Sequence, residues 1–186
     1  MAFRVLVAGG AGLVGSAVAR QLLSEGAEVA VVDALAEEGD GRAVREVRLE
    51  ALRAFPKATV LVADLSFSGA AADAFRDLRP DAVVNAAVFA PGKAGLAALL
   101  DAARSHGEPF LVHLSDSALY AAPASPSQPA LEDEPVDAGR DPLLLQRVAE
   151  EARLRASSVP NVVLRLFDLL APGAPPTRFP QDALES

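Results

Sequence analysis

A glycine-rich segment near the start of the chain has the residue types and spacing of a phosphate-binding turn. The segment Gly9-Gly10-Ala11-Gly12-Leu13-Val14-Gly15 follows a short apolar run that is typical of a strand, and a helical pattern follows it. In this G-x-x-G-x-x-G spacing, Gly9 permits a tight turn, Gly12 lets the backbone approach a pyrophosphate, and Gly15 lets the helix pack on the strand. The unpaired N–H groups and the positive dipole end of that helix favour phosphate. The segment therefore predicts a dinucleotide site.

One acidic residue indicates which dinucleotide would be bound. Asp33 ends the second predicted strand, roughly 20 residues after the glycines, where a carboxylate can hold the ribose hydroxyls of the adenosine. Such a carboxylate accepts hydrogen bonds from a free 2′-hydroxyl and repels a 2′-phosphate. Ala34 and Leu35 follow it, and no arginine occurs between it and Arg42. These features favour NAD over NADP, and they make an ordinary glycine turn without a ligand the weaker alternative.

Two polar residues near the end of the predicted fifth strand are candidates for catalysis. Asp116 could act as a general base if burial raised its pKa. Tyr120, the single tyrosine, could donate a proton or a hydrogen bond to a ligand. The alternatives are a turn aspartate that accepts a nearby N–H and a tyrosine with a structural role. The chain has no cysteine and only two histidines, His106 and His113, so we expect no metal site.

The composition argues against several classes of protein. With 186 residues, of which 51% are hydrophobic, we expect the chain to bury the core of one domain and not to be disordered. Its net charge of −8 opposes binding to the phosphate backbone of nucleic acids. No apolar run is long enough to cross a bilayer, and the first residues lack the pattern of a signal peptide. Together with the absence of cysteine, these features predict a cytoplasmic protein.

The elements that must position these residues alternate along the chain. Short apolar runs rich in β-branched residues alternate with longer helical stretches, as in a parallel sheet covered by helices. The stretch 121–142 contains five prolines and is expected to form a long loop within a domain that spans residues 1–173. Residues 174–186 are expected to form an irregular tail. Strands are predicted at 4–8, 28–33, 59–63, 82–85, 110–114 and 161–167, and helices near 13–25, 42–55, 70–78, 95–105 and 143–156.

Five segments carry a resemblance to a known family: VLVAGGAGLVGSAVARQLL, VADLS, RPDAVVNAAV, GLAALLDAARSHGEPFLVHLSDSALY and LRLFDLLAPG. With them, residues 3–173 resemble the extended short-chain dehydrogenase/reductases, specifically the NAD-dependent sugar-nucleotide epimerase/dehydratase type. The resemblance implies a Rossmann-type α/β fold, a doubly wound sheet of six parallel strands in the order 3-2-1-4-5-6. In addition to the glycines and Asp33, the resemblance implies cofactor contacts from Leu13, Val14, Asp64, Leu65, Ala86, Ala87 and Ser115.

The sequence departs from this family at the catalytic positions. Family members transfer protons with a Ser/Thr and a Tyr-x-x-x-Lys pair on a helix, supported by an asparagine. Aligning the segment GRDPLLLQRVAEEA with that helix places Leu143 at the tyrosine and Arg147 at the lysine, while Asp116 replaces the Ser/Thr and Gly92 the asparagine. Leucine cannot transfer a proton, and a guanidinium differs in size and shape from an ammonium. The chain is also expected to lack the substrate-binding lobe that the family adds after its sixth strand.

The resemblance and the departures together predict an NAD-binding protein of epimerase/dehydratase ancestry with atypical or absent redox chemistry, in small-molecule or nucleotide-sugar metabolism. Two alternatives remain: an active epimerase- or reductase-like enzyme that uses Asp116 and Tyr120, and a non-catalytic scaffold or regulatory subunit. In the family, the helices that correspond to 95–105 and 143–156 pair across a two-fold axis. Leucines 143–145 are consecutive and cannot all face one sheet. We therefore expect a homodimer.

Overall fold

The structure, a computed structural model, describes residues 2–36, 41–67, 69–120, 129–134, 136 and 138–167. Within them, strands and helices alternate as the sequence predicts, and the boundaries differ by no more than about two residues. The fifth strand is longer than predicted and includes Asp116 as its last residue. The tail at 174–186 and much of the proline-rich loop lie outside the described residues. The elements are β1 (Arg4–Ala8), α1 (Leu13–Ser24), β2 (Glu28–Asp33), α2 (Arg42–Arg53), β3 (Ala58–Val62), α3 (Ala70–Leu78), β4 (Ala82–Asn85), α4 (Gly95–Ser105), β5 (Phe110–Asp116), the short 3₁₀ helix η1 (Ser117–Leu119), α5 (Pro142–Arg155) and β6 (Asn161–Leu166).

The described strands form one sheet in the order β3-β2-β1-β4-β5-β6, with every neighbouring pair parallel. This arrangement confirms the predicted fold and strand order. Because all strands run the same way, their carboxyl ends lie at one edge of the sheet. The register brings Ala8 of β1 opposite Asn85 of β4, and Asn85 opposite His113 of β5. The residues that follow β1, β2 and β4 therefore meet at this edge, where a doubly wound sheet binds its ligands.

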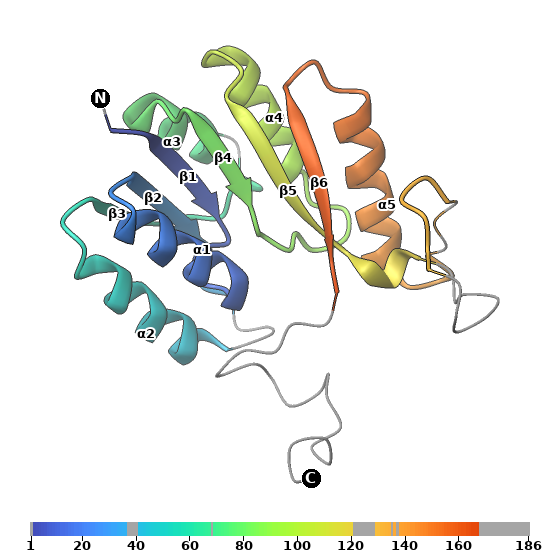
Figure 1. The fold of residues 1–186 in the computed structure, drawn as a ribbon, viewed down its shortest axis with the longest axis horizontal. Coiled ribbons are helices and arrows are strands. Elements are labelled where there is room, and N and C mark those ends of the chain that lie inside the picture. The colour runs from blue at the N-terminus through green and yellow to red at the C-terminus, as the bar shows by residue number, and fades with distance from the viewer. Residues whose placement is uncertain are drawn as a thin grey trace, which may run out of the picture.

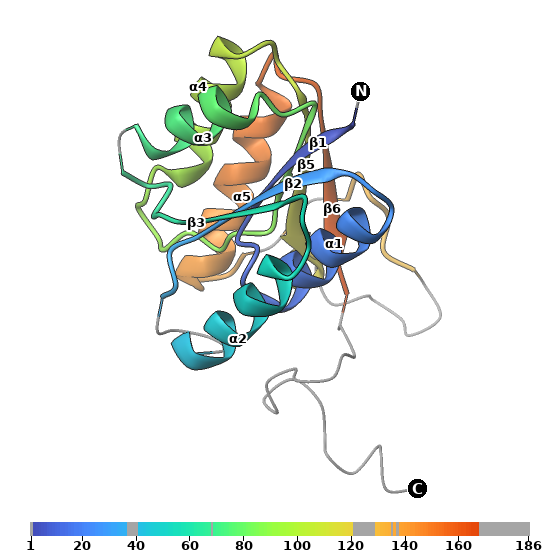
Figure 2. The ribbon, with the colours of Figure 1, turned by 90° about the vertical axis from the view of Figure 1, so that its left-hand side faces the viewer.

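Helices cover both faces of the sheet, as Figures 1 and 2 show. Helices α1 and α2 lie on one face, where Leu23 and Leu49 pack against Val5 and Val31. Helices α3, α4 and α5 lie on the other face, over a second core that includes Leu99. The central strands are apolar on both faces because each face is buried under helices. None of the described helices is long and apolar enough to span a membrane.

The outer strands β5 and β6 are covered by a described helix on one face only. Leu111 and Val163 pack in the core under α3, α4 and α5. On the opposite face, the side chains of Phe110, Val162 and Leu164 are 46%, 36% and 44% exposed. In Figure 1, β5 and β6 lie in front of α4 and α5, with no coloured helix before them. Since parallel strands are usually buried on both faces, these side chains mark an apolar face that the described residues leave open.

Candidate functional site

Gly9 and Gly15 are required by the packing of the chain itself. Gly9 follows β1 with a φ of +73°, and its N–H donates to the carbonyl of Val32 at 2.8 Å. A Cβ on Gly9 would lie 2.6 Å from the backbone of Ala87, so glycine allows the segment after β4 to approach the turn. A Cβ on Gly15 would lie 2.2 Å from the carbonyl oxygen of Gly9. Only glycine at this position lets α1 pack so closely on the turn.

Gly12 differs, because the protein's own packing restricts it less than it restricts Gly9 and Gly15. It is the N-cap of α1, with an ordinary φ of −69° and no side-chain hydrogen bond that caps the helix. A Cβ on Gly12 would meet one atom within 4 Å, the carbonyl oxygen of Gly9 at 3.2 Å. The first turn of α1 contains no acidic residue. The uncapped N-terminus of a helix beside an open glycine backbone fits the approach of a phosphate group.

Asp33 lies beside the glycine turn and is buried, with 4% of its surface exposed. Its Oδ2 accepts the N–H of Ala11 at 3.0 Å, and its Oδ1 accepts the N–H of Leu35 at 2.9 Å. A third donor comes from α2, where Nη1 of Arg45 lies 3.2 Å from Oδ1. Asp33 is thus held at the edge of the sheet against the turn. The contact with Arg45 could not be expected from the residues that directly follow Asp33.

The remaining residues predicted to contact the cofactor lie around the same edge. Leu13 and Val14 are half-buried at the start of α1. Ala86 and Ala87 follow β4, beside Gly9, and the N–H of Ala87 donates to Oδ1 of Asn85 at 3.3 Å. After β3, Leu65 is buried and Asp64 accepts the N–H of Ser66 at 2.8 Å. Ser115 is buried as well, and its hydroxyl donates to Glu151 at 2.7 Å.

Asp116 and Tyr120, the predicted catalytic candidates, both make local structural contacts. Asp116 accepts the N–H of Ala118 at 2.9 Å and so caps the short helix η1. The ring of Tyr120 stacks on that of Phe167, with centroids 6.0 Å apart. The guanidinium of Arg165 lies 4.6 Å from the centre of the tyrosine ring. These contacts are the ones that a turn aspartate and a structural tyrosine would make.

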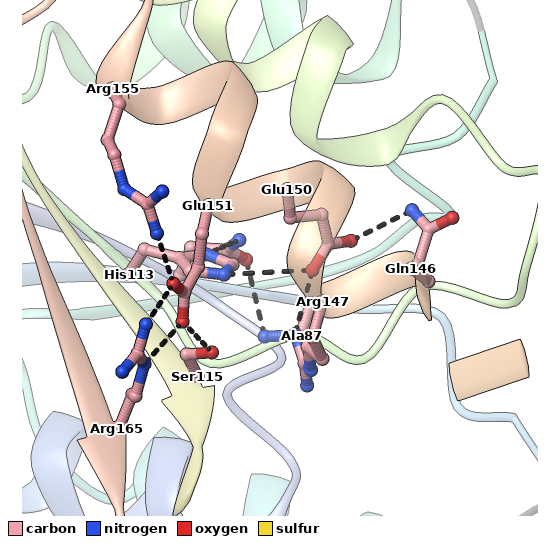
Figure 3. A network of polar contacts seen from close by, with 10 residues as sticks. Ala87, His113, Ser115, Gln146, Arg147, Glu150, Glu151, Arg155 and Arg165 are labelled. Carbon is pink, nitrogen blue, oxygen red and sulfur yellow. Dashed lines mark hydrogen bonds and ion pairs between the residues drawn. The ribbon is translucent and has the colours of Figure 1, made fainter. Parts of the chain in front are cut away.

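A buried ion cluster, which the sequence did not reveal, is centred on Glu151 between α5, β5 and β6 (Figure 3). Glu151 on α5 is 1% exposed and accepts two hydrogen bonds from Arg165 on β6, at 3.0 Å from Nε and 2.8 Å from Nη2. Arg155 donates to it at 2.7 Å, in addition to Ser115. Burial alone would raise the pKa of Glu151, but these hydrogen bonds and positive charges lower it below its ordinary value. The cluster thus joins α5 to β5 and β6.

A second buried group connects the end of β4 to α5. Nδ2 of Asn85 lies 2.9 Å from Nδ1 of His113, whose Nε2 faces Glu150 at 3.6 Å. Burial, followed by the positive charge of Arg147, lowers the pKa of His113 to about 4, so this imidazole is neutral at neutral pH. Glu150 also accepts Nη1 of Arg147 at 3.0 Å and the amide of Gln146 at 3.1 Å. The arginine at the family's lysine position is therefore held by Glu150 (Figure 3).

The first turn of α5 carries no proton-transferring side chain at the family's tyrosine position. Leu143 is half-buried there. Asp141 caps the helix by accepting the N–H groups of Leu143 and Leu144, at 2.7 and 3.3 Å. Among the described residues there is also no group of three or more acidic, histidine or cysteine side chains that could hold a metal ion. The arrangement can bind a dinucleotide, but it lacks the family's tyrosine–lysine pair.

A cavity of about 250 Å³ opens between the start of α4 and α5. Gly92 and Lys93 line it on one side, and Gln146, Glu150 and Arg153 line it on the other. None of the residues predicted to hold the dinucleotide contributes to its walls. The cavity is therefore separate from the glycine turn.

Comparison with known proteins confirms the resemblance. A model of the NAD dependent epimerase/dehydratase family matches residues 5–185. The chain is 30% identical to UDP-glucose 4-epimerase 4 of Oryza sativa subsp. japonica, over 94% of this chain and 51% of that protein. The chain therefore spans about half the length of the curated relatives it matches.

Solved structures with the same fold contain NAD. One is the enzyme WbmG of Bordetella bronchiseptica in complex with NAD, with a TM-score of 0.73 and 28% identity over 89% of this chain and 53% of that one. Another is the UDP-glucose 4-epimerase of Thermus thermophilus in complex with NAD, with a TM-score of 0.69 and 29% identity over 88% and 54%.

Proposed function

The chain belongs to the NAD-dependent epimerase/dehydratase family, and from that premise we propose that it binds NAD along the glycine turn. The observation that carries the proposal is the backbone at Gly12, where a Cβ would meet only the carbonyl oxygen of Gly9, beside the uncapped N-terminus of α1. In this proposal the backbone around Gly12 holds the pyrophosphate and Asp33 holds the adenosine ribose. Ala86 and Ala87, next to Gly9, line the site farther along the sheet edge. The NAD bound by two structural neighbours supports the assignment.

The proposal extends to chemistry that is atypical or absent. NAD, when bound, supplies a hydride acceptor or donor for a substrate carbon. A family member also needs a group that moves a proton, and positioned acid–base groups typically contribute about 10²–10⁴-fold in rate. Leu143 cannot do so, and Arg147 is engaged with Glu150. We place the protein in small-molecule or nucleotide-sugar metabolism by its family relationship, since its relatives include UDP-glucose 4-epimerases.

The alternative of an active enzyme that uses Asp116 and Tyr120 has less support. The carboxylate of Asp116 accepts a backbone N–H within its own turn. The tyrosine ring contacts both Phe167 and Arg165. A group that transfers protons must reach the substrate, and these contacts direct both side chains to structural roles. Non-catalytic binding of NAD is therefore favoured.

Titration with NADH tests the proposed function directly. We expect binding by calorimetry, and we expect Asp33→Asn to weaken it about tenfold, because a neutral amide replaces a charge-assisted acceptor of the ribose hydroxyls. Asp81→Asn is the matched control, since Asp81 pairs with Arg4 at the opposite edge of the sheet. If the wild-type protein and Asp33→Asn bind NADH with equal affinity, Asp33 does not hold the adenosine ribose. Absence of binding at millimolar NADH would leave a scaffold without a cofactor.

We also propose that the protein is a cytoplasmic homodimer that pairs through α4 and α5. Leu145, Ala149 and Ala152 are exposed on α5 at the spacing of one helical face. Ala97 of α4 and Ala149 border the same cavity, so this apolar stripe continues toward α4. We expect light scattering to give twice the chain mass of 19.2 kDa. A mass equal to one chain, independent of protein concentration, would contradict the dimer.

A further inference from the structure

Two arginines that are distant from Asp33 in the sequence lie at the adenosine end of the proposed site. They are Arg45 and Arg48, one turn apart on the same face of α2. We infer that this end of the site also accepts a 2′-phosphate, so that the protein binds NADP as well as NAD. The inference rests on the proposed function, and it changes the preference that Asp33 alone would predict.

The arginines reach the two structures that would surround the adenosine ribose. Nη1 of Arg45 lies 3.2 Å from Oδ1 of Asp33, and this pair is largely buried, with side chains 20% and 2% exposed. Nη1 of Arg48 donates to the carbonyl oxygen of Ala11 in the glycine turn, at 3.3 Å. Helix α2 thus brings both guanidinium groups to the edge between the turn and the end of β2.

The charge at this edge differs from that of a lone carboxylate. An isolated Asp33 would repel a 2′-phosphate. Here Arg45 is paired with Asp33 and offsets its charge, while Arg48 adds a second positive charge beside Ala11. Guanidinium groups match the geometry of phosphate oxygens and can bind them through two parallel hydrogen bonds. The balance of charge therefore no longer opposes a phosphate on the ribose.

Hydrogen bonds within the protein also leave Asp33 with fewer free acceptor positions for the ribose hydroxyls. Its two oxygens provide about four acceptor positions, and three donors already use them: the N–H groups of Ala11 and Leu35 and the side chain of Arg45. Arg45 and Arg48 also make other polar contacts in the chain. A guanidinium has five N–H donors, so it can serve several acceptors at once. We therefore expect this edge to change the ratio of the affinities for NADP and NAD.

Parallel titrations with NADH and NADPH at one salt concentration test the inference. We expect the two dissociation constants of the wild-type protein to agree within about tenfold. Arg45→Ala should weaken the binding of NADPH about tenfold more than the binding of NADH. The substitution removes a charge-assisted hydrogen bond to the 2′-phosphate and leaves the carboxylate of Asp33 to repel that phosphate. Arg53→Ala is the matched control, since Arg53 lies at the far end of α2, paired with Glu50. The pair 5′-AMP and adenosine 2′,5′-bisphosphate tests the same ratio without nicotinamide.

The outcomes separate this inference from the proposed function. If NADH binds and NADPH binds more than about tenfold more weakly, the site rejects the 2′-phosphate and the inference is overturned. It is also overturned if Arg45→Ala weakens both dinucleotides equally. If neither dinucleotide binds, the proposed function fails and the inference fails with it. The comparison of wild-type affinities needs no variant, so a poorly folded Arg45→Ala protein would not prevent the decision.

Discussion

Replacing Glu151 with alanine is expected to lower the free energy of unfolding by about 3–5 kcal/mol, the typical cost of leaving a buried charge without its partner. Glu151 is 1% exposed, and the side chain of Arg165, which donates to it twice, is 10% exposed. Without the carboxylate, Arg165 loses the anion with which it is paired between β6 and α5. Urea denaturation measures the change, and an unchanged m value would show that the folded and unfolded states keep their compactness.

Two further variants separate the loss of the ion pair from a general loss of packing. Glu151→Leu combined with Arg165→Met removes both charges and should recover part of the stability that Glu151→Ala loses. Glu50→Ala removes an exposed glutamate paired with Arg53 on α2, and should cost no more than about 1 kcal/mol. A loss below about 1 kcal/mol in Glu151→Ala would mean that water reaches the cluster and screens it.

The same carboxylate makes stability depend on pH. The pKa of Glu151 is lower in the folded protein than its ordinary value of 4.5. Its contribution is therefore complete above that ordinary value and is lost as the pH falls through the lower folded value. In Glu151→Ala this part of the acid sensitivity should be absent.

Replacing Gly15 or Gly12 with alanine is expected to give two opposite results. Gly15→Ala places a methyl group 2.2 Å from the carbonyl oxygen of Gly9. Helix α1 must then move from the turn, which should cost about 1–3 kcal/mol or more. Gly12→Ala meets one close contact, the carbonyl oxygen of Gly9 at 3.2 Å, and keeps an ordinary φ, so it should lower the melting temperature much less than Gly15→Ala does. It should nevertheless weaken NADH binding by about 100-fold, or about 2.7 kcal/mol, because the methyl group would occupy the space proposed for the pyrophosphate.

Thermal unfolding and calorimetry on the same preparations distinguish the two glycines. Ser24→Ala is a suitable control, since Ser24 lies at the far end of α1 and donates to the carbonyl of Arg20. Unchanged NADH affinity in a folded Gly12→Ala protein would show that the dinucleotide does not pass over this turn. A stable Gly15→Ala protein would show that α1 can move without loss of packing.

Much of the fold could be predicted from the sequence because its signals are local. Apolar runs of strand length alternate with helical stretches, and a parallel sheet with covered faces is the arrangement that buries both. The glycine turn was predictable from its own spacing, and the contact that requires Gly15 comes from Gly9 within the turn, whereas the contact that requires Gly9 comes from Ala86 and Ala87 after β4 and is visible only in the structure. The prediction for β5 was two residues too short because Ser115 and Asp116 are polar, yet they pair with Arg165 and Leu166 of β6.

The contacts of the catalytic candidates could not be predicted from local sequence patterns. Asp116 and Tyr120 were chosen for their chemistry and their place after a strand. In the structure, Asp116 accepts the N–H of Ala118, and the ring of Tyr120 contacts Phe167 and Arg165. Whether they act in catalysis stays a prediction, but a capping aspartate and a structural tyrosine would account for each of these three contacts.

The sequence by itself determined the class of fold and the position of the glycine turn, because both depend on patterns within one or two neighbouring elements, while the order of the strands was expected from the family resemblance. Only the tertiary structure decided which charges meet. Among the 17 lysines and arginines of the chain, nothing in their spacing singles out Arg45 for Asp33 or Arg165 for Glu151. These partners come from different elements, and the packing of α2 on β2 and of α5 on β6 brings them together. Ion pairs of this kind depend on distances between elements and on burial, and a sequence pattern reports neither.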